Sequence, residues 1–265
     1  MNRHGFLTLR SATALAATML AFAFATTAAR AAGPFSDDFS GTTLNSGWTS
    51  VTPNPASSIG LTGSGALEMV SSWANGGSDL YGGSNYSGDR ILQAVDPSLD
   101  WTITTELNFN PTDDYQGAGI LLSTTTGTYT STSQFSRVIE RAFYPAGGGN
   151  IVESAAGVSR YASDDIYLRV TKVGDAYTTS YSSDGATYAV LGTTTDPTVY
   201  TSIGLFTLRQ PWGGQQINSV ADFKFFDVTV ASSAPEASTW AMMLVGFGGL
   251  GLAGWRGARR NRALG

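Results

Sequence analysis

The sequence contains no cysteine, and its single histidine, His4, lies close to the N-terminus. Without cysteine, the chain has no disulfide bond, no thiol nucleophile and no cysteine-ligated zinc. If the N-terminal segment is removed, no histidine remains, which excludes Ser-His-Asp hydrolase chemistry and histidine-ligated metal sites. An enzyme built from this sequence would have to work with carboxylates, tyrosine, arginine or lysine.

The first 32 residues have the layout of a secretory signal peptide. A basic start precedes an uncharged run of apolar and small residues at positions 11–29, and the segment ends in Ala29-Arg30-Ala31. Its strongly apolar part, residues 15–25, is shorter than the roughly 20 residues that a membrane-spanning helix needs. We therefore expect export across the inner membrane, with cleavage after Ala31.

The C-terminal end has the pattern of a membrane-spanning helix followed by a basic tail. Residues 237–255 carry no charge, and a helix of this length is roughly 28 Å long, close to the hydrocarbon thickness of a bilayer. Four arginines follow directly, at Arg256, Arg259, Arg260 and Arg262. They should stay on the cytoplasmic side, which places the preceding residues outside. A buried C-terminal helix is the alternative, but five glycines make it a poor core element.

A short motif stands at the start of this tail. Pro235 and Glu236 are followed by Trp240-Ala241. Together with the apolar helix and the arginines Arg256, Arg259 and Arg260, this motif resembles the PEP-CTERM sorting signal in its Trp-Ala variant. The resemblance implies recognition by an exosortase-type enzyme, transient insertion into the inner membrane, and release or attachment at the surface of an exopolysaccharide-producing Gram-negative bacterium.

These signals divide the chain into three segments and determine the charge of the middle one. The segments are a signal peptide at 1–32, a folded domain at 33–231 and a sorting tail at 232–265, with its motif at 235–241, membrane helix at 237–255 and basic end at 256–262. Without the seven arginines and one glutamate of the terminal segments, 8 basic and 19 acidic side chains remain, a formal charge of −11. Such a surface repels phosphate, so we expect no nucleic-acid partner.

The middle segment has the residue alternation of an all-β fold. In residues 101–109 apolar and polar side chains alternate, which predicts a half-buried strand. Residues 167–173 and 176–181 predict a hairpin around Gly174-Asp175. Further strands are expected at 91–95, 119–123, 135–143, 151–154, 202–208 and 222–230. We expect two packed antiparallel sheets, with Trp48 and Trp101 in the core.

Several of these segments, taken in order, resemble a known family. They are Asp37-Asp38-Phe39-Ser40-Gly41, Tyr115-Gln116-Gly117-Ala118-Gly119-Ile120-Leu121-Leu122, Asp184-Gly185-Ala186-Thr187-Tyr188, Ile203-Gly204-Leu205-Phe206 and Phe223-Lys224-Phe225-Phe226-Asp227-Val228. They are similar to the concanavalin A-like lectin/glucanase sandwich, in the branch found at the end of bacterial β-xylosidases and in uncharacterised secreted proteins. The resemblance implies an all-β, two-sheet antiparallel jelly-roll sandwich over residues 33–231.

Glycosidase chemistry needs two carboxylates roughly 5–9.5 Å apart. The catalytic glucanases of this superfamily carry them in a Glu-x-Asp-x-Glu arrangement, which is absent here. The strand-borne candidates that remain are Glu106, Glu140 and Glu153. If residues 145–150 close a hairpin, Glu153 lies opposite Arg141, and a cross-strand ion pair explains it better than catalysis. We therefore expect no enzymatic activity.

Four aromatic residues stand in loop-like segments rich in Gly, Ser and Asn, and are candidates for stacking on sugar rings: Trp73, Tyr81, Tyr86 and Trp212. The alternative is that they cap the ends of the sandwich. The leading hypothesis is a non-enzymatic, lectin-like protein that binds extracellular polysaccharide in the exopolysaccharide matrix. Two alternatives stay open: a glycoside hydrolase or polysaccharide lyase with an unrecognised carboxylate or tyrosine site, and a structural matrix protein without glycan binding.

No cofactor is predicted from the sequence. A structural calcium ion stays open, because the superfamily that the domain resembles often carries one and paired acids supply oxygen ligands. The weak candidates are Asp37, Asp38, Asp113 and Asp114. No EF-hand spacing occurs, and we favour solvated loop positions for these acids.

Overall fold

The computed structural model describes residues 33–80, 88–135, 138–144, 151–157, 165–212 and 215–231. The predicted signal peptide, sorting motif and membrane helix lie outside these residues, as do Tyr81 and Tyr86. Across the described ranges, no helix has the length and apolar character needed to cross a membrane.

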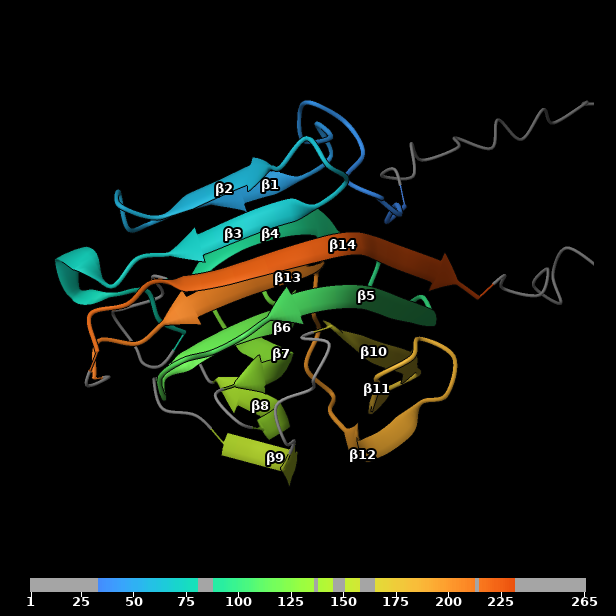
Figure 1. Cartoon of the computed structure of the whole chain (residues 1–265). Helices are drawn as coiled ribbons and strands as arrows, with labels where there is room; N and C mark the ends of the chain where they lie inside the picture. Colours follow the sequence, from blue (N-terminus) through green and yellow to red (C-terminus); the bar gives the residue numbers. More distant parts are fainter. Residues whose placement is uncertain are drawn as a thin grey trace, which may run out of the picture. The chain divides into compact units, whose positions relative to one another are not determined.

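The described residues form two antiparallel sheets of seven strands each, stacked as a sandwich (Figure 1). The first sheet, ordered β1-β4-β13-β6-β7-β8-β9, consists of β1 (Thr49–Val51), β4 (Asp89–Ala94), β6 (Gln116–Ser123), β7 (Tyr129–Phe135), β8 (Val138–Tyr144), β9 (Ile151–Gly157) and β13 (Ser202–Arg209). The second sheet, ordered β12-β11-β10-β5-β14-β3-β2, consists of β2 (Ser58–Leu61), β3 (Leu67–Ser71), β5 (Trp101–Phe109), β10 (Asp165–Val173), β11 (Ala176–Ser182), β12 (Ala189–Thr195) and β14 (Ser219–Val230). A short 3-10 turn, η1 (Ala74–Gly76), follows β3. The predicted all-β jelly-roll sandwich is confirmed.

The core lies between the two sheets and follows from residue alternation. Along β5 every second side chain is buried, so Trp101 and Ile103 point inward. Ile120 and Leu205 of the first sheet face the same core. Each large apolar side chain buried in this way contributes about 1.5–3 kcal/mol. The prediction that Trp48 and Trp101 are core residues is confirmed, with 7% and 2% of their surface exposed.

The turn between β10 and β11 follows from its sequence. Val173 pairs with Ala176, and Gly174 between them has φ of +56°. Glycine reaches this left-handed conformation without the steric cost that other residues meet. The predicted hairpin is confirmed.

The predicted register of β8 and β9 is wrong by one residue. Arg141 lies opposite Ser154 and not opposite Glu153, because the register shifts directly after Arg141. Such a bulge inserts an extra residue, which the alternating sequence does not reveal. Arg141 is instead fully buried between the sheets, with Nη2 3.6 Å from the Asp196 carboxylate and its guanidinium 5.3 Å from the ring centre of Tyr177.

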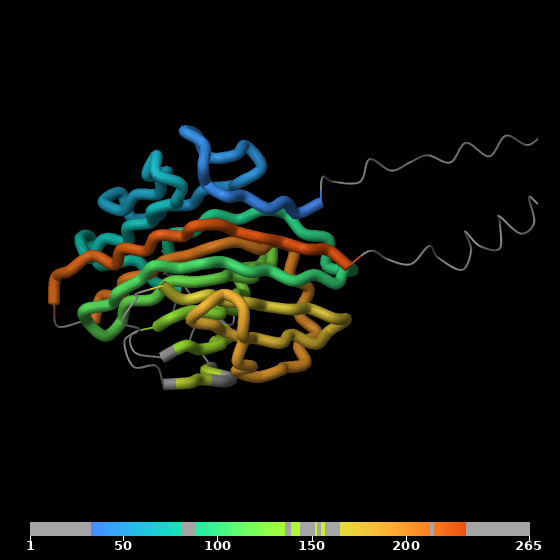
Figure 2. Tube along the Cα trace, turned by 45° about the vertical axis from the view of Figure 1, so that its right-hand side comes forward, coloured from blue at the N-terminus to red at the C-terminus, as the bar shows by residue number. Residues whose placement is uncertain are grey.

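The two ends of the described chain lie side by side (Figure 2). Asp37 N donates to Phe226 O at 2.8 Å, and Phe226 N donates to Asp37 O at 2.7 Å. Strand β3 pairs with β14 only as far as Phe223. The segment around Asp37 therefore pairs with β14 beyond the end of β3.

Candidate functional site

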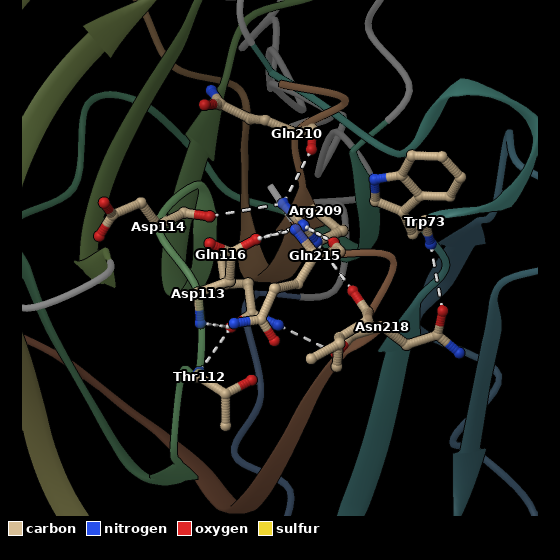
Figure 3. A network of polar contacts seen from close by, with 10 residues as sticks. Trp73, Thr112, Asp113, Asp114, Gln116, Arg209, Gln210, Gln215 and Asn218 are labelled. Carbon is tan, nitrogen blue, oxygen red and sulfur yellow. Dashed lines mark hydrogen bonds and ion pairs between the residues drawn. The ribbon is translucent and has the colours of Figure 1, made fainter. Parts of the chain in front are cut away.

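A buried arginine organises one end of the sandwich (Figure 3). Arg209, the last residue of β13, is fully buried. Its guanidinium forms an ion pair with Asp113 at 2.7 Å and donates to the carbonyls of Ile217 at 2.8 Å and Gln210 at 2.9 Å, and to that of Gln215. A buried cation is tolerated only with such partners. The side chain of Arg209 thereby connects the β5–β6 loop with the β13–β14 loop, which are distant in sequence.

A glutamine extends this network to the first of the predicted sugar-binding residues. Gln116 Oε1 accepts from the backbone N–H groups of Thr112 at 2.8 Å and Asp113 at 3.0 Å. Its Nε2 donates to Asn218 O at 3.0 Å, and Asn218 Oδ1 accepts from Trp73 N at 3.1 Å (Figure 3). The backbone of Trp73 is therefore held in place by the same loops that surround Arg209.

The segment that contains Trp73 also pairs with the end of β13. Ser78 N donates to Arg209 O, and Arg209 N donates to Ser78 O, both at 2.8 Å. The structure thus brings Trp73 and Trp212, predicted from separate loops, to one end of the sandwich. Trp212 follows Arg209 by three residues and is 56% exposed.

Tyr115 is an aromatic residue at this end that sequence reasoning missed. Its carbonyl accepts from Gln210 N at 2.9 Å, and its side chain is 39% exposed. Its φ of +71° is a conformation that non-glycine residues rarely adopt and that often marks functional loops. Trp73 is only partly exposed, and its indole Nε1 is buried without a hydrogen-bond partner among the described residues. We call Trp73, Tyr115 and Trp212 the aromatic end.

Glu140 lies elsewhere, on the outward face of the first sheet. It is opposite Ser133 and alternates with the inward-facing Ile139 and Arg141 of β8. Only 6% of Glu140 is exposed, and burial raises the pKa of its carboxyl to about 7. A carboxylic acid that keeps its proton near neutral pH is a suitable proton donor.

Glu106, another of the predicted carboxylates, does not form a pair with Glu140. Glu106 lies on the outward face of the second sheet, opposite Tyr167. A hydrogen bond to Glu106 is the main reason that the pKa of Tyr167 rises to about 12. The two sheets therefore separate Glu106 from Glu140. The side chain of Glu153 lies outside the description.

The paired acids proposed for calcium serve other roles where their contacts are seen. Asp37 accepts from Phe39 N at 2.9 Å and from Trp48 Nε1 at 2.8 Å, and Asp113 pairs with Arg209. Asp38 accepts from the hydroxyl and backbone of Ser40, which lower the pKa of its carboxyl. Asp114 contributes its carbonyl to Arg209 at 3.4 Å. Over the described residues, no group of three or more Asp, Glu, His or Cys side chains is arranged to hold a metal ion.

Comparison with protein families agrees with the geometry of the sandwich. A family model described as the beta xylosidase C-terminal concanavalin A-like domain matches residues 36–229. The chain belongs to this family. No curated protein matches it.

Solved structures share the fold of this xylosidase C-terminal domain. The GH43 protein BlXynB of Bacillus licheniformis has a TM-score of 0.58 and 20% identity, covering 73% of this chain and 38% of that protein. The xyloglucan PUL protein GH43B of Bacteroides ovatus has a TM-score of 0.56 and 18% identity, covering 75% and 39%. A structure described with endo-acting O-glycanases of the human gut microbiota has a TM-score of 0.51 and 8% identity, covering 75% and 99%. The chain therefore spans well under half of both GH43 proteins.

The family corrects the functional hypothesis. A non-enzymatic, lectin-like protein was expected, but the matching family is a domain of beta xylosidases, and several solved relatives are GH43 glycoside hydrolases. Both that hypothesis and the expectation that the chain has no enzymatic role are wrong. The missing Glu-x-Asp-x-Glu motif excludes one arrangement of carboxylates on one strand; it does not exclude a sandwich that belongs to a larger hydrolase.

Proposed function

We propose that this chain takes part in the hydrolysis of xylan-type glycans, as the concanavalin A-like part of a β-xylosidase-type enzyme system. The observation that carries the proposal is the family match over residues 36–229, which covers the whole sandwich. The match covers 38% of BlXynB, so the proposal concerns the concanavalin A-like part of such an enzyme and not its remaining part.

In this proposal the aromatic end contacts the glycan. Trp212 is 56% exposed, and an aromatic ring next to polar groups suits the apolar C–H face and the hydroxyls of a sugar unit. The Arg209 network holds the backbone of the loops that carry the aromatic end, so little conformational freedom is lost when a ligand binds. Tyr81 and Tyr86 stay predicted glycan contacts.

The test measures xylose release from arabinoxylan by a GH43 β-xylosidase, with and without the purified chain. We expect the chain to raise the initial rate at low substrate concentration. Trp73→Ala and Trp212→Ala should lose this increase, while Val190→Ala, which alters an exposed residue of β12, should keep it. If neither the chain alone nor the mixture releases more sugar than the control, the proposed role is wrong.

A second candidate function is hydrolysis by the sandwich itself, with Glu140 as the proton donor. It is favoured by the Glu140 pKa of about 7 and by the gut bacterial structure described with endo-acting O-glycanases, 99% of which is covered. A glycosidase also needs a second carboxylate within roughly 5–9.5 Å. If Glu140 acts as the acid, sugar release by the chain alone should fall as the pH rises above about 7 and should vanish in Glu140→Gln. Release that survives this substitution would contradict the role.

We also propose that the chain is exported and sorted to the cell surface, where extracellular polysaccharide is available as its partner. The support is the sequence of the two ends: the signal peptide with its exit at Ala31, and the Pro235-Glu236 motif, apolar stretch and arginines that resemble a PEP-CTERM signal. Mass spectrometry of the surface-extracted protein should find an N-terminus at Ala32 and no residues after the sorting motif. An intact chain in the cytoplasm would contradict export.

A further inference from the structure

The outward face of the second sheet carries a row of side chains that lies apart from the aromatic end. Phe225 of β14, Glu106 of β5 and Tyr167 of β10 lie directly opposite one another on adjacent strands. Directly paired residues project from the same side of a sheet. All three are partly exposed, whereas the neighbouring Phe226 is fully buried in the core.

A β-bulge in β14 places Phe225 on this face. The register shifts between Phe223 and Phe225, so that Phe223 and Phe226 both point into the core and Phe225 points outward. The ring of Phe225 lies 6.4 Å from that of Tyr167, at an angle of 41°. Bulges that re-aim a side chain in this way are common next to functional sites. Strand β14 lies between β3 and β5, so the row crosses the middle of the sheet (Figure 1).

A third ring, that of Tyr188, lies over the same face. Arg169 follows Tyr167 by two residues on β10, and its guanidinium carbon is 3.4 Å from the ring centre of Tyr188. Arg169 Nε donates to Thr104 Oγ1 at 3.2 Å, which fixes the guanidinium on the sheet. The cation covers one face of the Tyr188 ring, and the tyrosine is partly exposed. We call Phe225, Tyr167 and Tyr188 the aromatic platform.

An open pocket of about 610 Å³ adjoins the platform and shares Phe225 with it. Its polar lining includes Asp38, Asn45 and Asp227. Ser36 Oγ donates to Asp227 Oδ1 at 2.8 Å, so one oxygen of this carboxylate is already engaged. This volume lies within the range of small-molecule and cofactor sites.

A carboxylate oxygen on the same face is buried. Asp222 precedes the bulge in β14 and lies opposite Asn108, in the row next to that of Phe225 and Glu106. Its Oδ1 is shielded from solvent and accepts no hydrogen bond from the described residues. An oxygen shielded in this way is out of reach of a ligand in this structure, so Asp222 is not counted among the groups that bind one.

We propose that the aromatic platform and this pocket bind a neutral glycan. The identification of the ligand as a xylan-type glycan rests on the proposed function. Aromatic rings accept the C–H faces of sugar units, and Asp227 and Glu106 accept hydrogen bonds from hydroxyl groups. The lining of the pocket contains three carboxylates and no basic side chain. Like charges repel, so glycans that carry uronic acids bind less tightly.

The test is calorimetric titration of the full chain with xylohexaose, in EDTA. We expect saturable binding that weakens roughly tenfold in Tyr188→Ala and in Phe225→Ala, the change that corresponds to about 1.4 kcal/mol. Asp227→Asn should weaken binding several-fold. Xylohexaose substituted with glucuronic acid should bind less tightly, and added salt should reduce this difference.

Matched variants separate this inference from the proposed function. Tyr188→Ala alters a loop residue, so it serves if Phe225→Ala fails to fold, and Val190→Ala should bind xylohexaose like the wild type. Trp212→Ala should keep platform binding while losing the increase in xylose release. If xylohexaose does not bind, or if platform variants bind it like the wild type, the inference is wrong even where the rate increase persists. Binding that requires added calcium also overturns it, because the carboxylates would then hold a metal ion.

Discussion

Replacing Glu140 by glutamine should make the stability of the protein less dependent on pH. The folded state raises the pKa of this carboxyl from the ordinary 4.5 to about 7 because the group is buried. Below pH 4.5 the carboxyl is protonated in both the folded and the unfolded state, so folding pays no penalty. Between these two values the unfolded chain loses the proton first, and the free energy of unfolding therefore falls as the pH rises.

The magnitude follows from the size of this shift. At about 1.4 kcal/mol for each pH unit, the loss of stability reaches about 3 kcal/mol above pH 7. Glutamine has nearly the same shape and no charge, but its amide donors also need partners, which costs about 1 kcal/mol. At pH 8 we therefore expect Glu140→Gln to be about 2 kcal/mol more stable than the wild type. At pH 4 the wild type should be equally or slightly more stable.

Urea unfolding at pH 4, 6 and 8 measures this difference. The free energy of unfolding at each pH is the product of the urea midpoint and the slope of the transition. Glu68→Gln is the matched control, because Glu68 is exposed on β3 and its substitution should have little effect at any of these pH values. The reasoning is refuted if the difference between Glu140→Gln and the wild type is the same at pH 4 and pH 8.

Three further substitutions test the packing that supports the candidate site. Arg209→Ala removes a fully buried guanidinium and leaves the Asp113 carboxylate without its cation and several carbonyls without a donor. Urea unfolding should show a loss of about 3–5 kcal/mol in the free energy of unfolding, and a loss below about 1 kcal/mol would contradict a buried network. Tyr200→Phe removes a hydroxyl that donates to Asp196 at 2.7 Å. Thermal unfolding should show a loss of about 1–2 kcal/mol in the free energy of unfolding, and an unchanged stability would contradict this hydrogen bond. Gly185→Ala places a Cβ on a residue with φ of +70°, 2.9 Å from the Tyr167 ring. It should lower the free energy of unfolding by about 1–2 kcal/mol. An unchanged melting temperature would contradict the geometry of this turn.

The sequence predicted the strands in which apolar and polar residues alternate, but it did not predict β7. That strand is rich in serine and threonine, and Ser131, Thr132 and Ser133 would be expected at the surface. They are at most 2% exposed, in part because hydroxyls meet across the sandwich: Thr132 Oγ1 lies 3.3 Å from Thr179 Oγ1. A pairing of this kind depends on two strands that are distant in sequence, so local hydropathy does not reveal it.

The candidate site was predicted in part, for the same reason. Glycine-flanked aromatics identified Trp73 and Trp212, because a large apolar side chain in a loop is unusual in any fold. Nothing local shows that these two residues share one end of the sandwich. Their proximity depends on Arg209, whose partner Asp113 is far away in sequence. The positions of Phe225 and Glu153 were missed because each depends on a β-bulge, which shifts the register without an alternation signal.

The role in glycoside hydrolysis is tested most directly by the rate of xylose release from arabinoxylan by a GH43 β-xylosidase in the presence of this chain. The wild-type chain should raise the initial rate, Val190→Ala should do the same, and Trp212→Ala should leave the rate at that of the enzyme alone. A wild-type chain that neither raises this rate nor releases sugar by itself would contradict the proposed role.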